Sequence, residues 1–249
     1  MPAIILATFG AFSTIVRRAL SKPLFRDRVC HYMAFMRSIT HFIFSPASRL
    51  ARLMIGEKRL PCEAVPAEDP TRQLPVFVEL DKSERVGLWA ILDHLEGTYP
   101  DDPMVPEDAQ TRAEALRILD WAMGPFATRI TAKIVNQKAS PRFTGALQHT
   151  SPDMNLVRDG RKALHGQMLE FGKRADEQGY LAGKFCTVAD LALAANLSAL
   201  DYFGEVKWDD YPSMREWYMR VKSRHGFRPL LSDRVPGQPP VMHYSELDF

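Results

Sequence analysis

Two serines lie where an apolar run gives way to a helical pattern, in the stretch FIFSPASRLARLMIGEKRLPC at residues 42–62. A serine between a strand and a helix has two common uses. Its hydroxyl can hydrogen-bond to a bound thiolate and so lower the pKa of that thiol. Alternatively, it can accept hydrogen bonds from the free N–H groups of the first helical turn. Ser45, directly before Pro46, is placed for either use, whereas Ser48 lies one turn further and is expected to be only a helix residue.

The other reactive residue types show no pattern that indicates a further site. The seven histidines have no metal-ligand spacing, and the three cysteines (Cys30, Cys62 and Cys186) form no C-x-x-C pair. No glycine-rich nucleotide-binding pattern is present. We therefore expect no metal site and no cofactor, and we expect the cysteines to be small buried hydrophobic residues in a reducing compartment.

Strand and helix patterns alternate in the first part of the chain. Residues 38–44 and 61–66 favour strands, residues 75–80 predict a third strand, and Val86 lies in or near a fourth. Helical spacing is found at residues 46–57 and 88–99. In the first of these helices we expect Arg49, Arg52, Lys58 and Arg59 to form the solvent face. This order predicts one sheet covered by helices.

The character of the chain changes after a proline-rich stretch. Residues 99–106 read YPDDPMVP, which indicates a linker. Helical periodicity then continues through residues 107–138, 153–178, 187–203 and 212–223, with no strand pattern. The last 23 residues contain four prolines and cannot form a continuous helix. The predicted fold class is thus a small α/β domain at 36–99, a linker at 100–106, an all-α domain at 107–228 and a tail at 229–249.

Residues 1–35 differ from the rest in charge. They carry a balance of +4, which leaves −2 for the remainder of a chain with a net charge of +2. An acidic body argues against nucleic acid as a partner. The apolar run from Ala3 to Val16 is too short to span a bilayer as a helix. Because Met33 and Met36 precede the first clear element, we expect the native protein to begin at Met36.

Three segments resemble the glutathione S-transferase superfamily. FSPASRLARLMIGEKRLPCE resembles its first strand, first helix and second strand, and LPVFV at 74–78 resembles the segment in which the proline is cis. GKFCTVADL at 183–191 is similar to the start of its buried helix. The resemblance covers Met36 to about Pro229 and implies a thioredoxin-like domain followed by a helical domain. Thr187 and Asp190 then form a capping box whose role is folding, and we expect Asp190→Ala to cost on the order of 1 kcal/mol or more.

The resemblance also predicts where glutathione would bind. Ser45 corresponds to the catalytic hydroxyl of serine-type transferases, and the backbone of Leu74, before cis Pro75, would pair with the bound peptide. The clamp for the γ-glutamyl group, an acid followed by Ser or Thr, corresponds to Gly87 and Leu88. Both polar groups of the clamp are therefore missing. The eight residues 67–74 are also too few for the second helix of the family, so we expect little or no glutathione chemistry and interpret Ser45 as a helix cap.

The last third of the chain resembles one alphaproteobacterial branch of this superfamily, known as FtsZ-localised protein A. The likeness is carried by residues 197–212, by 217–223, by 227–237 and by the ending HYSELDF. In that branch the fold binds filaments of the tubulin-like protein FtsZ during constriction, and the tail is tied to division. The resemblance implies partner-binding residues at Tyr244, Leu247, Asp248 and Phe249. Self-docking of this tail on the helical domain is the alternative.

The sequence thus favours a cytoplasmic, homodimeric protein of the transferase fold that binds FtsZ filaments at the division site. The alternative is a serine-type glutathione S-transferase that conjugates glutathione, as substrate, to small electrophiles, with Ser45 stabilising the thiolate. A third interpretation is a related enzyme that uses another thiol.

Overall fold

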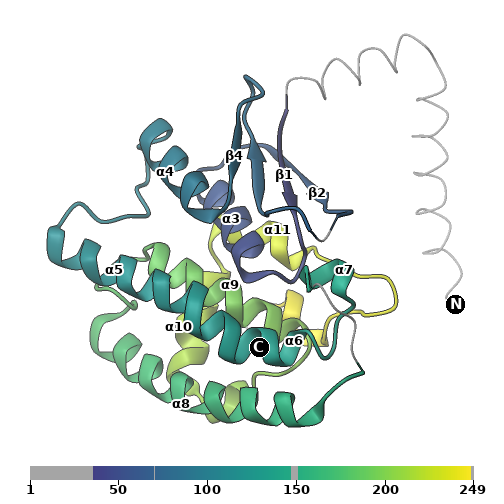
Figure 1. Ribbon diagram of the computed structural model, residues 1–249. Helices are drawn as coiled ribbons and strands as arrows, with labels where there is room; N and C mark the ends of the chain where they lie inside the picture. The colour runs from purple at the N-terminus through teal and green to yellow at the C-terminus, as the bar shows by residue number, and fades with distance from the viewer. Residues whose placement is uncertain (1–35, 70, 147–150, 248–249) are drawn as a thin grey trace, which may run out of the picture.

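The computed structural model describes residues 36–69, 71–146 and 151–247. The expected start at Met36 concerns residues 1–35, which lie outside this described part. Figure 1 shows a small sheet with helices beside it, packed on a larger group of helices. The predicted fold class, a thioredoxin-like α/β domain followed by an all-α domain, is confirmed.

The first part of the chain forms a four-stranded mixed sheet with the order β2-β1-β3-β4. The strands β1 and β2 are parallel, whereas β3 is antiparallel to both β1 and β4. The α3 helix connects β1 to β2, and α4 follows β4. The bounds are β1 Arg37–His41, α3 Pro46–Glu57, β2 Cys62–Pro66, β3 Val76–Val78, β4 Glu84–Val86 and α4 Leu88–Thr98.

Between β2 and β3, the described residues contain no helix. This agrees with the expectation that residues 67–74 are too short for one. One face of the sheet carries Ile39 and Phe77, which are paired across β1 and β3 and are almost fully buried in the same hydrophobic cluster as residues of α3 and α4. Val65 and Val86 belong to the opposite face and are 37% and 43% exposed.

The second part of the chain is helical throughout. Its long elements are α5 Ala109–Trp121, α8 Met154–Gln178, α9 Val188–Tyr202 and α10 Pro212–Lys222. Shorter elements connect or follow them: η1 Ala122–Thr131, α6 Ala132–Val135, α7 Pro141–Thr144, η2 Trp208–Asp210, η3 His225–Phe227, α11 Arg228–Leu231 and η4 Met242–Ser245.

One predicted helix is not regular. The pattern at residues 107–138 becomes α5, a π-helical stretch η1 that contains Pro125, and α6. Proline lacks the N–H that a regular helix needs and clashes with the preceding turn. The buried amide of Asn196 donates to the carbonyl oxygen of Ala122 at 3.1 Å, and Thr131 donates to Asn196 at 2.7 Å. Asn196 therefore joins α9 to both ends of η1, through the backbone carbonyl of Ala122 and the side-chain hydroxyl of Thr131.

The core is shared by both parts of the chain. All residues of α9 are buried, and this helix packs against α3, α5 and η1. The α3 helix is likewise buried on most sides, from Ser48 to Ile55. The two domains therefore bury one continuous hydrophobic cluster, with α3 and α9 at its centre.

Candidate functional site

Ser45 lies at the N-terminus of α3 and caps it. Its hydroxyl accepts from the backbone N–H of Ser48 at 3.5 Å, and Pro46 occupies the first helical position. Ser48, which is fully buried, accepts from the N–H of Phe42 at 3.2 Å. Both serines therefore stabilise the turn from β1 into α3. Ser48, which was expected to be only a helix residue, also hydrogen-bonds to the backbone of this turn.

The segment around α7 packs directly beside this turn. The N–H of Phe44 donates to the carbonyl oxygen of Phe143 at 2.9 Å, and the two rings meet edge to face. Gly145 has a φ of 77°, and a Cβ atom there would lie 2.5 Å from the Phe42 ring. Only glycine fits at this position, and the contact brings residues 140–145 against the loop that carries Ser45.

The Leu74–Pro75 peptide bond is cis, as the resemblance implies. The carbonyl oxygen of Pro75 accepts from the N–H of Gly87 at 2.8 Å. No hydrogen bond joins the backbone N–H or C=O of Leu74 to another described residue. Those two groups therefore remain available to pair with an extended peptide, which is the role predicted for Leu74.

The clamp positions hold no polar side chain. Gly87 is the N-cap of α4 with a φ of 86° and makes no side-chain cap, while Leu88 is 8% exposed. The first turn of α4 contains no acidic residue. A bound ammonium and carboxylate would lose charge-assisted hydrogen bonds worth about 1.5–3 kcal/mol each at these positions. The backbone groups of Leu74 are thus unpaired within the described residues, whereas the two positions predicted for the γ-glutamyl clamp carry no polar side chain.

A second set of polar residues lies inside the protein, centred on Arg49. This guanidinium is fully buried and donates to Ser198 at 2.7 Å and to the carbonyl oxygen of Ile43 at 2.8 Å. It also donates to Asp233 at 3.4 Å and to the hydroxyl of Tyr244. Arg49 therefore connects α3 to α9 and to the tail.

Arg52 makes the stronger contact to the same aspartate. Its guanidinium donates to both carboxylate oxygens of Asp233, at 2.7 and 2.9 Å, and to the carbonyl oxygen of Pro229 at 3.0 Å. The expectation that these arginines lie on the solvent face of α3 is wrong, because residues 229–244 cover that face. The Lys58 ammonium forms an ion pair with Glu96 at 2.9 Å. Of the four basic residues expected on the solvent face, only Arg59 is exposed.

The tail folds back on the helical domain at several further points. The Tyr202 hydroxyl accepts from the N–H of Val235 at 3.0 Å and donates to the carbonyl oxygen of Gln238 at 2.7 Å. His243 contacts the buried Asp201 at 3.0 Å. Lys222 donates to the carbonyl oxygen of His243 at 3.1 Å. Self-docking, the alternative weighed from the sequence, is thus present in the structure.

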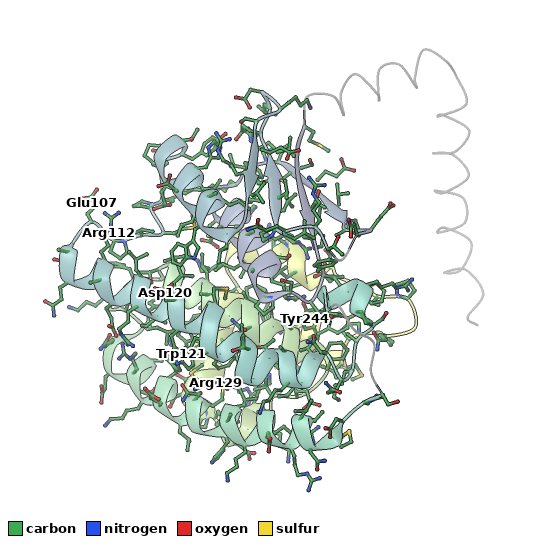
Figure 2. The ribbon with its side chains drawn as sticks, in the orientation of Figure 1. Glu107, Arg112, Asp120, Trp121, Arg129 and Tyr244 are labelled. Carbon is green, nitrogen blue, oxygen red and sulfur yellow. The ribbon has the colours of Figure 1, made fainter. Side chains whose placement is uncertain are left out.

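The four predicted partner-binding residues are placed differently. Tyr244 is fully buried, packs on the Tyr202 ring with the centroids 5.1 Å apart, and lies in the interior in Figure 2. Its side chain therefore anchors the tail and offers no surface to a partner. Leu247 is 45% exposed. Asp248 and Phe249 lie outside the described residues.

Thr187 and Asp190 form the capping box at the start of α9. The Thr187 hydroxyl accepts from the N–H of Ala189 at 3.3 Å, and Asp190 accepts from the N–H of Thr187 at 2.9 Å. Asp190 also accepts from the N–H of Leu181 and from the indole of Trp217, both at 2.9 Å. Asp190 therefore joins α9 to α10 and to the loop that contains Leu181, whereas an ordinary helix cap bonds only within its own first turn.

The two described cysteines are poor nucleophiles. Burial raises the pKa of the Cys62 thiol to about 12, and burial also raises the pKa of Cys186. Because the thiolate is the reactive form, burial disfavours nucleophilic chemistry at both thiols. The described residues contain no group of three or more His, Cys, Asp or Glu side chains that could hold a metal ion. Nor does a helix in the described ranges have the length and apolar character needed to cross a membrane.

Comparisons with known proteins agree on the fold. Residues 161–233 match the family model described as the glutathione S-transferase C-terminal domain. FtsZ-localized protein A of Caulobacter vibrioides is 37% identical over 231 residues, which cover 87% of this chain and 100% of that protein. The crystal structure of a glutathione S-transferase from Rhodospirillum rubrum and the structure of FzlA from C. crescentus are each 36% identical to this chain. Each has a TM-score of 0.79 and covers 86% of this chain and 100% of the other.

Proposed function

We infer that the chain, which belongs to the glutathione S-transferase-like family of FtsZ-localized protein A, acts in cell division by binding FtsZ filaments. The likeness to that relative along its whole length carries this proposal. The loss of both polar clamp groups at Gly87 and Leu88 supports it, because a glutathione site without them binds its substrate weakly. We propose that the protein acts in the cytoplasm and gathers at the division site.

The exposed side chains of the tail are our proposed contact with the filament. Met242 and Leu247 are 90% and 45% exposed and flank the buried Tyr244. Tyr244 holds the backbone of η4 in place, so that the apolar groups on either side are presented on a fixed support. A preorganised apolar contact costs less conformational entropy on binding than a free tail does.

We also propose that the protein is a homodimer that pairs through the face formed by α4 and α5. Trp89 on α4 is 49% exposed and lines a cavity of about 310 Å³ together with Leu92, Arg112 and Leu116. Arg112 lies where α5 begins, below α4 (Figure 2). A second copy would cover the indole. Light scattering should give the mass of two chains, and Trp89→Glu should give the mass of one.

Co-pelleting with polymerised FtsZ tests the main proposal. The wild-type protein should sediment with the polymer, and Leu247→Ser should sediment less. Leu169→Ser is the matched control, since Leu169 is 55% exposed on α8, outside the tail. Absence of the wild-type protein from the pellet would count against the proposal, and equal loss in both variants would count against the tail as the contact.

The serine-type transferase is the second candidate. It is favoured by the hydroxyl of Ser45 at the start of α3 and by the unpaired backbone of Leu74. Conjugation of glutathione to a generic aromatic electrophile tests it. Robust turnover that disappears in Ser45→Ala, together with no FtsZ binding, would replace the leading proposal with this one.

A further inference from the structure

The loop before α9 presents an aromatic side chain to solvent on a fixed backbone. Phe185 is 81% exposed. The loop that carries it is closed by a hydrogen bond from the N–H of Tyr180 to the carbonyl oxygen of Gly183, at 2.9 Å. Leu181, which is fully buried, is held by Asp190. The exposure of Phe185 therefore belongs to a preorganised loop.

The linker between α4 and α5 contributes the other side of the cavity to which Phe185 belongs. The Lys58 ammonium donates to the carbonyl oxygens of Asp101 and Asp102, at 3.0 and 3.2 Å. Asp102 adopts a φ of 52°, a left-handed conformation that aspartate tolerates better than most residues. Its carboxylate forms no hydrogen bond or ion pair with a described residue. The backbone of this acid is thus fixed while its charge is left uncompensated.

Between the two walls lies a cavity of about 310 Å³. Its lining combines apolar and charged groups, including Glu57, Asp102, Tyr180, Phe185 and Arg224. Arg224 and Glu57 neutralise each other, since the guanidinium Nε donates to Glu57 at 2.9 Å. With that pair satisfied, the lining retains one net negative charge, on Asp102. An anionic ligand would be repelled there, and a cation would be attracted.

One aromatic residue of the cavity lining, Tyr180, already contacts a cation of the protein itself. The guanidinium carbon of Arg220 lies 5.6 Å from the centroid of the Tyr180 ring, and Arg220 donates to the carbonyl oxygen of Gly179 at 2.8 Å. Guanidinium groups stack on aromatic rings while their N–H groups bond to oxygen acceptors. Phe185 and Asp102 offer the same two elements, a ring face and an acceptor, and no cation from the described part of the chain lies over the Phe185 ring.

We propose that this cavity is a docking site for an arginine side chain of a protein partner. The guanidinium lies beside the Asp102 carboxylate and against the Phe185 ring, and the methylene groups cover the apolar wall at Met104. Arginine fits better than lysine because its planar group stacks on the ring and hydrogen-bonds to the carboxylate at once. The site is separate from the tail and does not depend on the proposed binding of FtsZ.

Titration of the ¹⁵N-labelled full chain with N-acetyl-arginine amide tests the proposal by NMR. We expect saturable shifts of the backbone amides of residues 102–104 and 183–187. Phe185→Leu keeps an apolar side chain but removes the π face, so the affinity should fall by about two- to fivefold. Asp102→Asn removes the charge at constant size and should also weaken binding, and the double variant should abolish it.

Three controls make the result decisive. N-acetyl-glutamate amide should cause no saturable shift in these residues, and N-acetyl-lysine amide should bind more weakly than the arginine compound. Leu169→Ser, on the distant surface of α8, should bind like the wild type. The proposal is overturned if the arginine compound causes no saturable shift, if the glutamate compound shifts the same amides, or if Phe185→Leu and Asp102→Asn leave the affinity unchanged.

Discussion

The guanidinium of Arg49 donates to the hydroxyl of Tyr244 inside the protein, although 195 residues separate the two. The hydroxyl in turn donates to the carbonyl oxygen of Leu230 at 2.9 Å. Burial raises the pKa of Tyr244 to about 12, so the hydroxyl stays protonated at physiological pH. This contact joins the first helix of the α/β domain to the last turn of the described chain.

Removal of this hydroxyl should destabilise the fold. Tyr244→Phe leaves a buried N–H of Arg49 without its partner, while the Leu230 carbonyl keeps its bond from the N–H of Asp233; the unpaired N–H costs about 1–3 kcal/mol. Urea denaturation should show a lower midpoint with an unchanged slope. Tyr180→Phe is the control, because the Tyr180 hydroxyl makes no hydrogen bond to a described residue. An equal effect of the two variants would contradict the anchoring role.

The tail should separate into a folding part and a binding part. A truncation that removes residues 246–249 keeps Tyr244, so it should retain wild-type stability and lose FtsZ co-pelleting. A truncation that removes residues 243–249 takes the anchor as well and should lower the free energy of unfolding. If the shorter truncation sediments with FtsZ like the full chain, the exposed end of the tail is not the contact.

Asp190 should matter far more than an ordinary helix cap. It is fully buried and accepts from Leu181, Thr187 and Trp217, so Asp190→Ala should cost more than about 3 kcal/mol. Asp108 also caps a helix, α5, but it is exposed, and its carboxylate accepts from the N–H and hydroxyl of Thr111 within the same turn. Asp108→Ala should lower the stability much less, because this cap faces solvent. Equal losses in thermal and urea denaturation would refute this difference.

Stability should decline in mild acid because of His41. Burial, and next the charge of Arg52, lower the pKa of His41 to about 4 from an ordinary value of 6.5. The unfolded chain therefore binds a proton between these two pH values that the folded protein does not bind. Stability is complete above pH 6.5 and falls towards pH 4 by up to about 1.4 kcal/mol per pH unit from this residue.

Urea denaturation across this pH range measures that slope. His41→Gln has no imidazole to protonate and should show a flatter dependence between pH 6.5 and 4. The exposed His225 provides the control, and His225→Gln should keep the wild-type slope. An unchanged slope in His41→Gln would assign the acid sensitivity to other groups.

Local signals in the sequence predicted most of the fold. Helical spacing placed α8, α9 and α10 within about two residues of their bounds. The capping box at Thr187 followed from a short motif, whereas the cis bond at Pro75 was implied by the family resemblance. The break of the long helix into α5, η1 and α6 was missed, although Pro125 was a signal for it.

The buried polar network could not be predicted from the sequence. Arg49 and Arg52 lie opposite the apolar residues of α3, which is the pattern of a solvent face. Their partners Ser198, Asp233 and Tyr244 are 149 to 195 residues away, and no local pattern indicates such pairs. Burial of Tyr244 depends on the path of the whole tail. The prolines show that the tail is not a continuous helix, but they do not indicate the path that it takes.

The pairing of Arg52 and Arg49 with Asp233 also constrains when the protein can fold during synthesis. Asp233 is translated 184 residues after Arg49, which takes roughly 10–40 s at a typical rate of 5–20 residues per second. Throughout that interval the two arginines lack the carboxylate that pairs with both of them. We therefore expect the α3 helix to complete its buried polar contacts only after Asp233 has been made, late in synthesis.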